Sequence, residues 1–194
     1  MKKYLGFLVL LIAASQTNAA IIQGDFRTES DLPGQGSGAL VYEALNVNVG
    51  SGDELTNSDF IENPSSWNGG VVNMDLDSTT NILTLKSQDD WDFYTFDAWI
   101  SNIVFNAGEV ITGISLLSGN LTSLNLLANL SFADNSIHIN YTGDSAFNFT
   151  GTDAQFQILT SNVSAVPIPA AALLFAPALL GFMGFRRKAK NIIA

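Results

Sequence analysis

Hydrophobic and polar residues alternate along most of the middle of the chain, a pattern typical of half-buried β-strands. In the clearest segment, Ile137, Ile139 and Tyr141 alternate with His138 and Asn140. The same two-residue period recurs in five other segments, whose hydrophobic members are Val41, Leu45, Val47 and Val49; Leu83 and Leu85; Leu124, Leu126, Leu130 and Phe132; Phe147 and Phe149; and Phe156 and Ile158. We therefore predict strands rather than helices outside the two ends of the chain.

Turn-forming residues separate these segments, because Gly, Asn, Asp, Ser and Pro cluster at 50–53, 63–64, 68–70, 106–108, 118–120, 133–135 and 142–144. Short strands at a spacing of roughly 8–12 residues are typical of antiparallel β-sandwiches. The pattern predicts an all-β protein, with an antiparallel β-sandwich or jelly-roll-like ectodomain over residues 20–165.

The N-terminus has the three parts of a secretory signal peptide. Lys2 and Lys3 precede an apolar run at 5–14, and a polar stretch with small residues follows it. Ten apolar residues are too short to cross a hydrocarbon core of about 30 Å, which argues against an uncleaved anchor. We expect residues 1–19 to be removed by cleavage after Ala19, with cleavage after Ala20 as the alternative.

The C-terminus predicts a transmembrane helix. Residues 166–185 carry no charge, and a helix of that length covers about 30 Å, one hydrocarbon core. The basic segment 186–194 follows at once, and its cationic residues are Arg186, Arg187, Lys188 and Lys190. A basic stop-transfer cluster belongs on the cytoplasmic side, so the membrane would hold the precursor with its C-terminus in the cytoplasm and its body outside.

Val166, Pro167, Ile168 and Pro169 form a V-P-x-P motif at the start of the uncharged span. This motif, the span and the basic cluster together resemble the PEP-CTERM sorting signal of Gram-negative bacteria. The match is to a V-P-x-P subtype, whereas the namesake motif has Glu between the prolines. The resemblance covers about the last 30 residues and does not extend to the body. It implies that an exosortase, an integral-membrane cysteine-dependent enzyme, processes the tail near the proline motif. It further implies that the inner membrane holds the precursor with its body in the periplasm, and that the body is then delivered to the cell surface or to an exopolysaccharide matrix.

A glycosylphosphatidylinositol signal is the alternative interpretation of the tail. Small residues at 161–165 precede the apolar run, and the sequence contains N-glycosylation sequons at Asn120, Asn129, Asn140, Asn148 and Asn162. Such signals normally end in the apolar segment without a basic stop, and that difference favours the sorting signal.

The body is strongly acidic. All 18 acidic residues lie in 20–165 together with only two cationic residues, Arg27 and Lys86, so its formal charge is −16. Such a field repels nucleic acid, which excludes nucleic-acid binding, and it attracts divalent cations. The chain has no cysteine, which also excludes disulfides, zinc–thiolate sites and a thiol nucleophile.

Calcium is the metal that the acidic loops favour, since it binds oxygen ligands and extracellular modules often bind it weakly. The candidate ligands are Asp75, Asp77, Asp89, Asp90 and Asp92. The first two lie in a segment with alternate oxygen ligands, but this segment lacks the Gly and the terminal Glu of an EF-hand loop. We expect no cofactor other than weakly bound Ca²⁺.

Aromatic residues raise the alternative of a carbohydrate-binding module, since aromatic faces beside carboxylates suit sugars. Trp91 is the exposed candidate, whereas we expect Trp99 in the core. His138 is the single histidine and lies on the polar side of its strand, and no G-x-S-x-G elbow accompanies it. We therefore expect no enzyme but a structural or interaction protein, with exopolysaccharide as a candidate partner and a secreted hydrolase as the least favoured alternative.

Overall fold

The computed structural model describes residues 20–31, 39–62, 72–88, 92–122, 126–149 and 153–162. All of them belong to the first of two compact units, Met1–Asn162. The signal peptide, the sorting motif, the apolar span and the basic tail lie outside the described residues. Within those residues no helix is long and apolar enough to cross a membrane.

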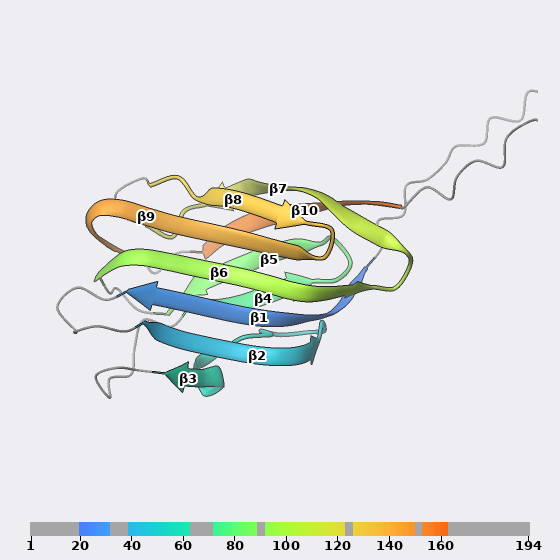
Figure 1. The fold of residues 1–194 in the computed structure, drawn as a ribbon, viewed down its shortest axis with the longest axis horizontal. Coiled ribbons are helices and arrows are strands. Elements are labelled where there is room, and N and C mark those ends of the chain that lie inside the picture. The colour runs from blue at the N-terminus through green and yellow to red at the C-terminus, as the bar shows by residue number, and fades with distance from the viewer. Residues whose placement is uncertain are drawn as a thin grey trace, which may run out of the picture. The chain divides into compact units, whose positions relative to one another are not determined.

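The described chain is all-β and its sheets are antiparallel, as the alternation predicts. The strands are β1 (Ile21–Asp31), β2 (Leu40–Asn48), β3 (Phe60–Glu62), β4 (Val72–Asp77), β5 (Ile82–Ser87), β6 (Asp92–Phe105), β7 (Glu109–Gly119), β8 (Asn129–Ala133), β9 (Ser136–Asn148) and β10 (Asp153–Asn162). They form a six-stranded sheet in the order β3-β2-β1-β6-β9-β8 and a four-stranded sheet in the order β4-β5-β10-β7. Figure 1 shows the four-stranded sheet behind the six-stranded one.

One hydrophobic cluster contains residues of both sheets, an arrangement consistent with a β-sandwich. The predicted alternation is confirmed in four segments, where the following residues are at most 2% exposed: Leu83, Leu85, Ile137, Ile139, Tyr141, Phe147, Phe149, Phe156 and Ile158. Aromatic rings fill one part of this core; the ring centroids of Phe93 and Phe149, for example, are 4.5 Å apart. Burial of these side chains supplies most of the driving force for folding, about 25 cal/mol per Å² of apolar surface.

The segment with Val41, Leu45, Val47 and Val49 changes face part-way along. The expectation that Val41 and Leu45 face the core is wrong, because Leu40 and Tyr42 do so instead. Leu45 is 59% exposed. Gly24 and Phe26 of β1 pair with Val47 and Ala44 of β2, which leaves one extra residue in β2. Such a bulge shifts the two-residue period by one position.

The carboxylate of Asp25 holds this bulge and a second one in β6. Asn46 and Asn102 have φ values of 55° and 50°, in the left-handed region that Asn tolerates better than most residues. Asp25 Oδ1 accepts a hydrogen bond from Asn46 N at 2.6 Å, and Asp25 Oδ2 accepts one from Asn102 Nδ2 at 2.6 Å. Asp25 therefore links the two strands that flank β1.

Two further expectations are wrong. The turn expected at 142–144 lies inside β9, where Thr142 and Phe147 pair with Thr95 and Phe93, so that three extra residues of β9 bulge out. The segment with Leu126, Leu130 and Phe132 is a strand only from Asn129 onward, in β8, and Phe132 is 50% exposed because β8 is an edge strand. Local alternation does not show where a strand leaves its sheet.

Candidate functional site

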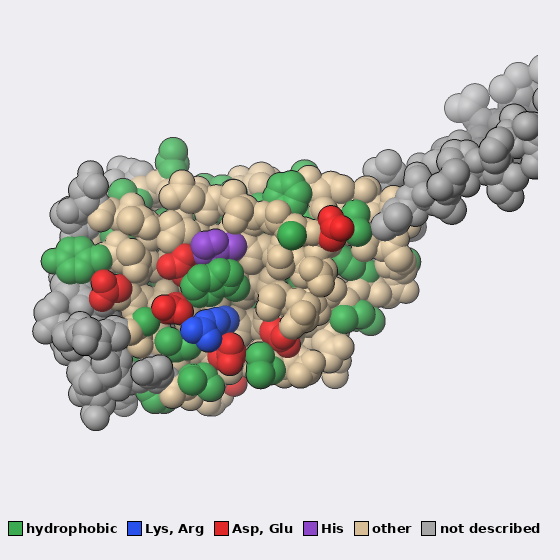
Figure 2. Space-filling view, viewed as in Figure 1, with side chains coloured by type: hydrophobic (Ala, Val, Ile, Leu, Met, Phe, Trp, Pro, Cys, Tyr) green, Lys and Arg blue, Asp and Glu red, His purple; other side chains and the backbone are tan. Residues whose placement is uncertain are grey.

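A row of side chains crosses five strands on the outer face of the six-stranded sheet. Cα pairing aligns Glu43 with Arg27, Arg27 with Trp99, Trp99 with His138, and His138 with Ser131. Paired residues of neighbouring strands lie on the same face of a sheet. Figure 2 shows that histidine, hydrophobic, cationic and acidic side chains gather near the middle of this face.

Trp99 lies in this row, so the expectation that it belongs to the core is wrong. Phe96, Ala98 and Ile100 are the buried members of β6, and the two-residue period therefore turns Trp99 outward. Its ring is stacked on the imidazole of His138, with centroids 4.8 Å apart and planes 6° from parallel. Two aromatic rings and a sheet backbone thus make a rigid wall on the surface.

Arg27 lies on the other side of the indole, with its guanidinium carbon 6.0 Å from the ring centroid. Arg27 donates hydrogen bonds to Glu29 at 2.9 Å and to Glu43 at 3.1 Å. The hydrogen bond to Glu29, assisted by that to Glu43, raises the pKa of Arg27 above its ordinary value despite partial burial. The guanidinium therefore stays protonated, and two carboxylates already pair with it.

His138 lies on the polar side of its strand, as expected, and Asp97 holds it in place. Its Nε2 is 2.6 Å from Asp97 Oδ1, which also accepts a hydrogen bond from Asn140 Nδ2 at 2.8 Å. An ionised carboxylate only accepts, so neutral His138 carries its proton on Nε2. Nδ1 is then an acceptor.

A shallow depression of about 340 Å³ opens beside the ring stack. Its lining residues are Trp99, Ile100, Ser101, Ser131, Phe132, Ala133, Ser136, Ile137 and His138. Six of these nine share the outward parity of β6, β8 and β9, and four of those six are Ser or Ala. The depression forms because these small side chains lie beside the larger, stacked rings of Trp99 and His138.

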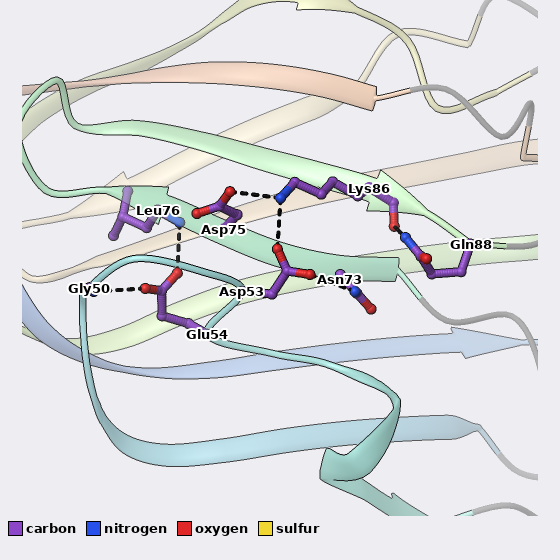
Figure 3. A network of polar contacts seen from close by, with 8 residues as sticks. All are labelled: Gly50, Asp53, Glu54, Asn73, Asp75, Leu76, Lys86 and Gln88. Carbon is purple, nitrogen blue, oxygen red and sulfur yellow. Dashed lines mark hydrogen bonds and ion pairs between the residues drawn. The ribbon is translucent and has the colours of Figure 1, made fainter.

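The second polar site lies on the four-stranded sheet, around Lys86 (Figure 3). Lys86 Nζ is 2.7 Å from Asp53 Oδ1 and 2.7 Å from Asp75 Oδ2. Burial by itself would lower the pKa of Lys86, but its hydrogen bonds to the two carboxylates outweigh that effect, and the pKa is raised. Asp75, a candidate calcium ligand, is therefore already paired with a lysine, which it shares with Asp53.

Glu54 lies beside this cluster and is only 6% exposed. Its Oε2 accepts a hydrogen bond from Leu76 N at 2.7 Å, and its Oε1 accepts one from Gly50 N at 3.1 Å (Figure 3). Burial raises the pKa of Glu54 in spite of these hydrogen bonds. Leu55 forms a β-bridge with Met74 in β4. The Glu54 carboxylate adds one hydrogen-bond acceptor along the same edge of the sheet, for the N–H of Leu76.

The other calcium candidates do not join this cluster in the described part of the chain. Asp77 Oδ1 accepts hydrogen bonds from Thr79 N at 2.7 Å and Thr80 N at 3.2 Å, and these bonds lower the pKa of Asp77. Asp89, Asp90 and the side chain of Asp92 lie outside the described residues, as does Trp91. No group of three or more His, Asp or Glu side chains among the described residues could hold a metal ion.

Sequence reasoning missed the row on the outer face because its members lie far apart in the chain. One signal was available: Trp99 alternates with Phe96 and Ala98 in the same way as the polar Asp97, which places Trp99 and Asp97 on one face of the strand. The sorting-signal residues, from Val166 to Lys190, and Ala19 lie outside the described residues, whereas Ala20 precedes β1 directly. No family model, no curated protein and no solved structure matches this chain.

Proposed function

We propose that this chain is an exported protein of a Gram-negative bacterium that carries a PEP-CTERM-type sorting signal and is processed by an exosortase. Its role at the cell surface or in the extracellular matrix is structural or interactive, not catalytic. The observation that carries this proposal is the order of three features at the C-terminus: the proline motif at 166–169, the uncharged span to 185, and the basic cluster from Arg186. The span crosses the inner membrane as a helix in the precursor.

The bounds of the folded body support this proposal. β1 begins at Ile21, directly after the two candidate cleavage sites, so signal-peptide removal would cost the sheet no residue. β10 ends at Asn162, four residues before Val166. Processing at both ends would therefore leave every strand intact.

The composition of the body agrees with a surface protein that folds without disulfides. A formal charge of −16 over 20–165 keeps a surface protein soluble. The fold needs no disulfide, because the two sheets share a hydrophobic core of adequate size.

The mass of the mature protein tests the proposal. In the native host we expect a Pro167→Ala/Pro169→Ala variant to be exported but to accumulate in the membrane as unprocessed precursor, since the processing enzyme would no longer recognise its motif. Pro177→Ala, a proline substitution inside the span, is the matched control and should mature normally. Mass spectrometry of the membrane and extracellular fractions reads out both terminal cleavages. Normal maturation of the double variant would contradict the proposal.

A carbohydrate-binding role in an exopolysaccharide matrix is the second candidate function. The observation that favours it is the outward position of Trp99, stacked on His138 in the middle of a sheet face. Aromatic side chains with a polar neighbour are the usual contact surface for sugars. This function uses the same export route as the first.

A further inference from the structure

We propose that the depression beside Trp99 and His138 is a binding subsite for an uncharged polysaccharide. This inference rests on the proposed residence of the body among polysaccharides, and it adds the site and the class of sugar. The depression has a volume of about 340 Å³, at the lower end of the range of ligand-cleft volumes, about 300–1,000 Å³. It therefore suits one or two sugar units of a longer chain that runs along the sheet.

The wall of the depression provides the apolar contact that a sugar ring needs. A pyranose has hydroxyls at its rim and C–H groups on its faces, and aromatic side chains bind such C–H patches. Trp99 and His138 line the depression together. One face of the Trp99 indole is covered by His138 and Arg27 lies over the other, so the aromatic face left for a sugar is that of the His138 imidazole, which the stack holds in one orientation. Asp97 fixes the imidazole further through Nε2, which leaves Nδ1 as an acceptor for a sugar hydroxyl.

The remainder of the depression provides hydroxyl groups. Ser101, Ser131 and Ser136 come from β6, β8 and β9, three neighbouring strands. Their hydroxyls make no hydrogen bond to any other described residue. Each hydroxyl can both donate and accept, which matches the chemistry of sugar hydroxyls. Strands also hold these groups more firmly than loops would.

The charges around the depression favour an uncharged ligand. Arg27 is paired with Glu29 and Glu43. The carboxylate of Asp97 accepts hydrogen bonds from His138 and Asn140, and that of Asp25, on the same face, accepts them from Asn46 and Asn102. None of these charges awaits a partner from the ligand, and a body of formal charge −16 repels a polyanion. An uncharged polysaccharide needs no charged partner on the protein, and the acidic body does not repel it.

Titration of the full chain in a detergent without sugar groups tests the proposal. The probes are cellohexaose, maltohexaose and mannohexaose, compared with an anionic hexagalacturonate and a cationic chitosan hexamer at equal concentration. We expect at least one uncharged probe to bind more tightly than both charged probes, with millimolar or lower Kd by calorimetry. Because the experiment uses purified protein, its outcome does not depend on export or tail processing.

Two sets of variants locate the binding. Trp99→Ala should weaken binding of the uncharged probe at least about tenfold, which corresponds to about 1.4 kcal/mol, whereas Tyr94→Ala, an exposed aromatic outside the depression, should leave it unchanged. Ser131→Ala/Ser136→Ala should weaken binding without unfolding the protein, and Ser51→Ala/Ser115→Ala is its matched control. Circular dichroism confirms the fold of each variant. Absence of binding by every uncharged probe, preference for a charged probe, or unaltered affinity of the folded serine variant would each overturn the proposal.

Discussion

Replacement of Glu54 should destabilise the fold in a way that depends on pH. The Glu54 carboxylate is the partner of the Leu76 backbone N–H at the edge of β4, at 2.7 Å, and of the Gly50 N–H, at 3.1 Å. In Glu54→Ala both donors lose this acceptor. In Glu54→Gln the side-chain oxygen still accepts from Leu76, but the amide group then faces the Gly50 donor.

The magnitude follows from the burial of the two donors. Leu76 is 0% exposed, and a buried donor left unpaired costs about 1–3 kcal/mol. Gly50 is exposed, so water replaces its lost partner at little cost. We therefore expect Glu54→Ala to lower the free energy of unfolding by about 1–3 kcal/mol, and Glu54→Gln to lower it by about half as much.

The pH dependence has a definite sign. Burial raises the pKa of Glu54, so between the unfolded and folded pKa values the native state binds more protons than the unfolded state. The contribution of Glu54 to stability is therefore complete below its unfolded pKa and declines as pH rises through the higher, folded pKa. The difference in stability between wild type and Glu54→Gln should shrink from pH 4 towards pH 7.

Urea unfolding of residues 20–165, followed by tryptophan fluorescence at pH 4, 5.5 and 7, measures these differences. Other carboxyl groups titrate equally in both proteins and cancel in the comparison. Asp134→Asn, at an exposed turn, is the control and should change stability by less than about 0.5 kcal/mol at every pH. A Glu54→Ala protein as stable as wild type, or a difference that grows with pH, would refute the reasoning.

Two further substitutions test the backbone. Gly119 has a φ of 75°, and a Cβ there would lie 1.9 Å from the carbonyl oxygen of Asp153, so Gly119→Ala should cost at least about 2 kcal/mol in urea unfolding. Gly108→Ala, with no atom within 4 Å of its Cβ, should be nearly neutral; equal stability of the two variants would contradict this account. Asp25→Ala removes the carboxylate that holds both bulges next to β1, and should cost about 1 kcal/mol by the same measurement. Asp31→Ala, at the exposed end of β1, is its control, and identical unfolding midpoints would show that the bulges do not depend on Asp25.

Local pattern was sufficient to predict which residues of many strands face inward. Ile137, Ile139 and Tyr141 are buried, as their alternation with polar residues indicates, because the side chains of any strand point alternately to its two faces. The same rule failed at Leu45, since a bulge adds a residue that the hydrophobic pattern does not reveal. The terminal segments are also local signals, and they stay predictions because they lie outside the described residues.

The candidate sites were decided by tertiary structure. Arg27, Trp99 and His138 are separated by 72 and 39 positions in the chain, and they meet only because β6 pairs with β1 on one side and with β9 on the other. Likewise, Glu54 is buried because its loop pairs with β4. The sequence by itself determined the strand content and the acidic charge of the body, and it predicts the signals at the two ends, since all of these depend on neighbouring residues alone. Which strands pair, and so which side chains share a face, depends on the free energy of the whole core and cannot be found in any one segment.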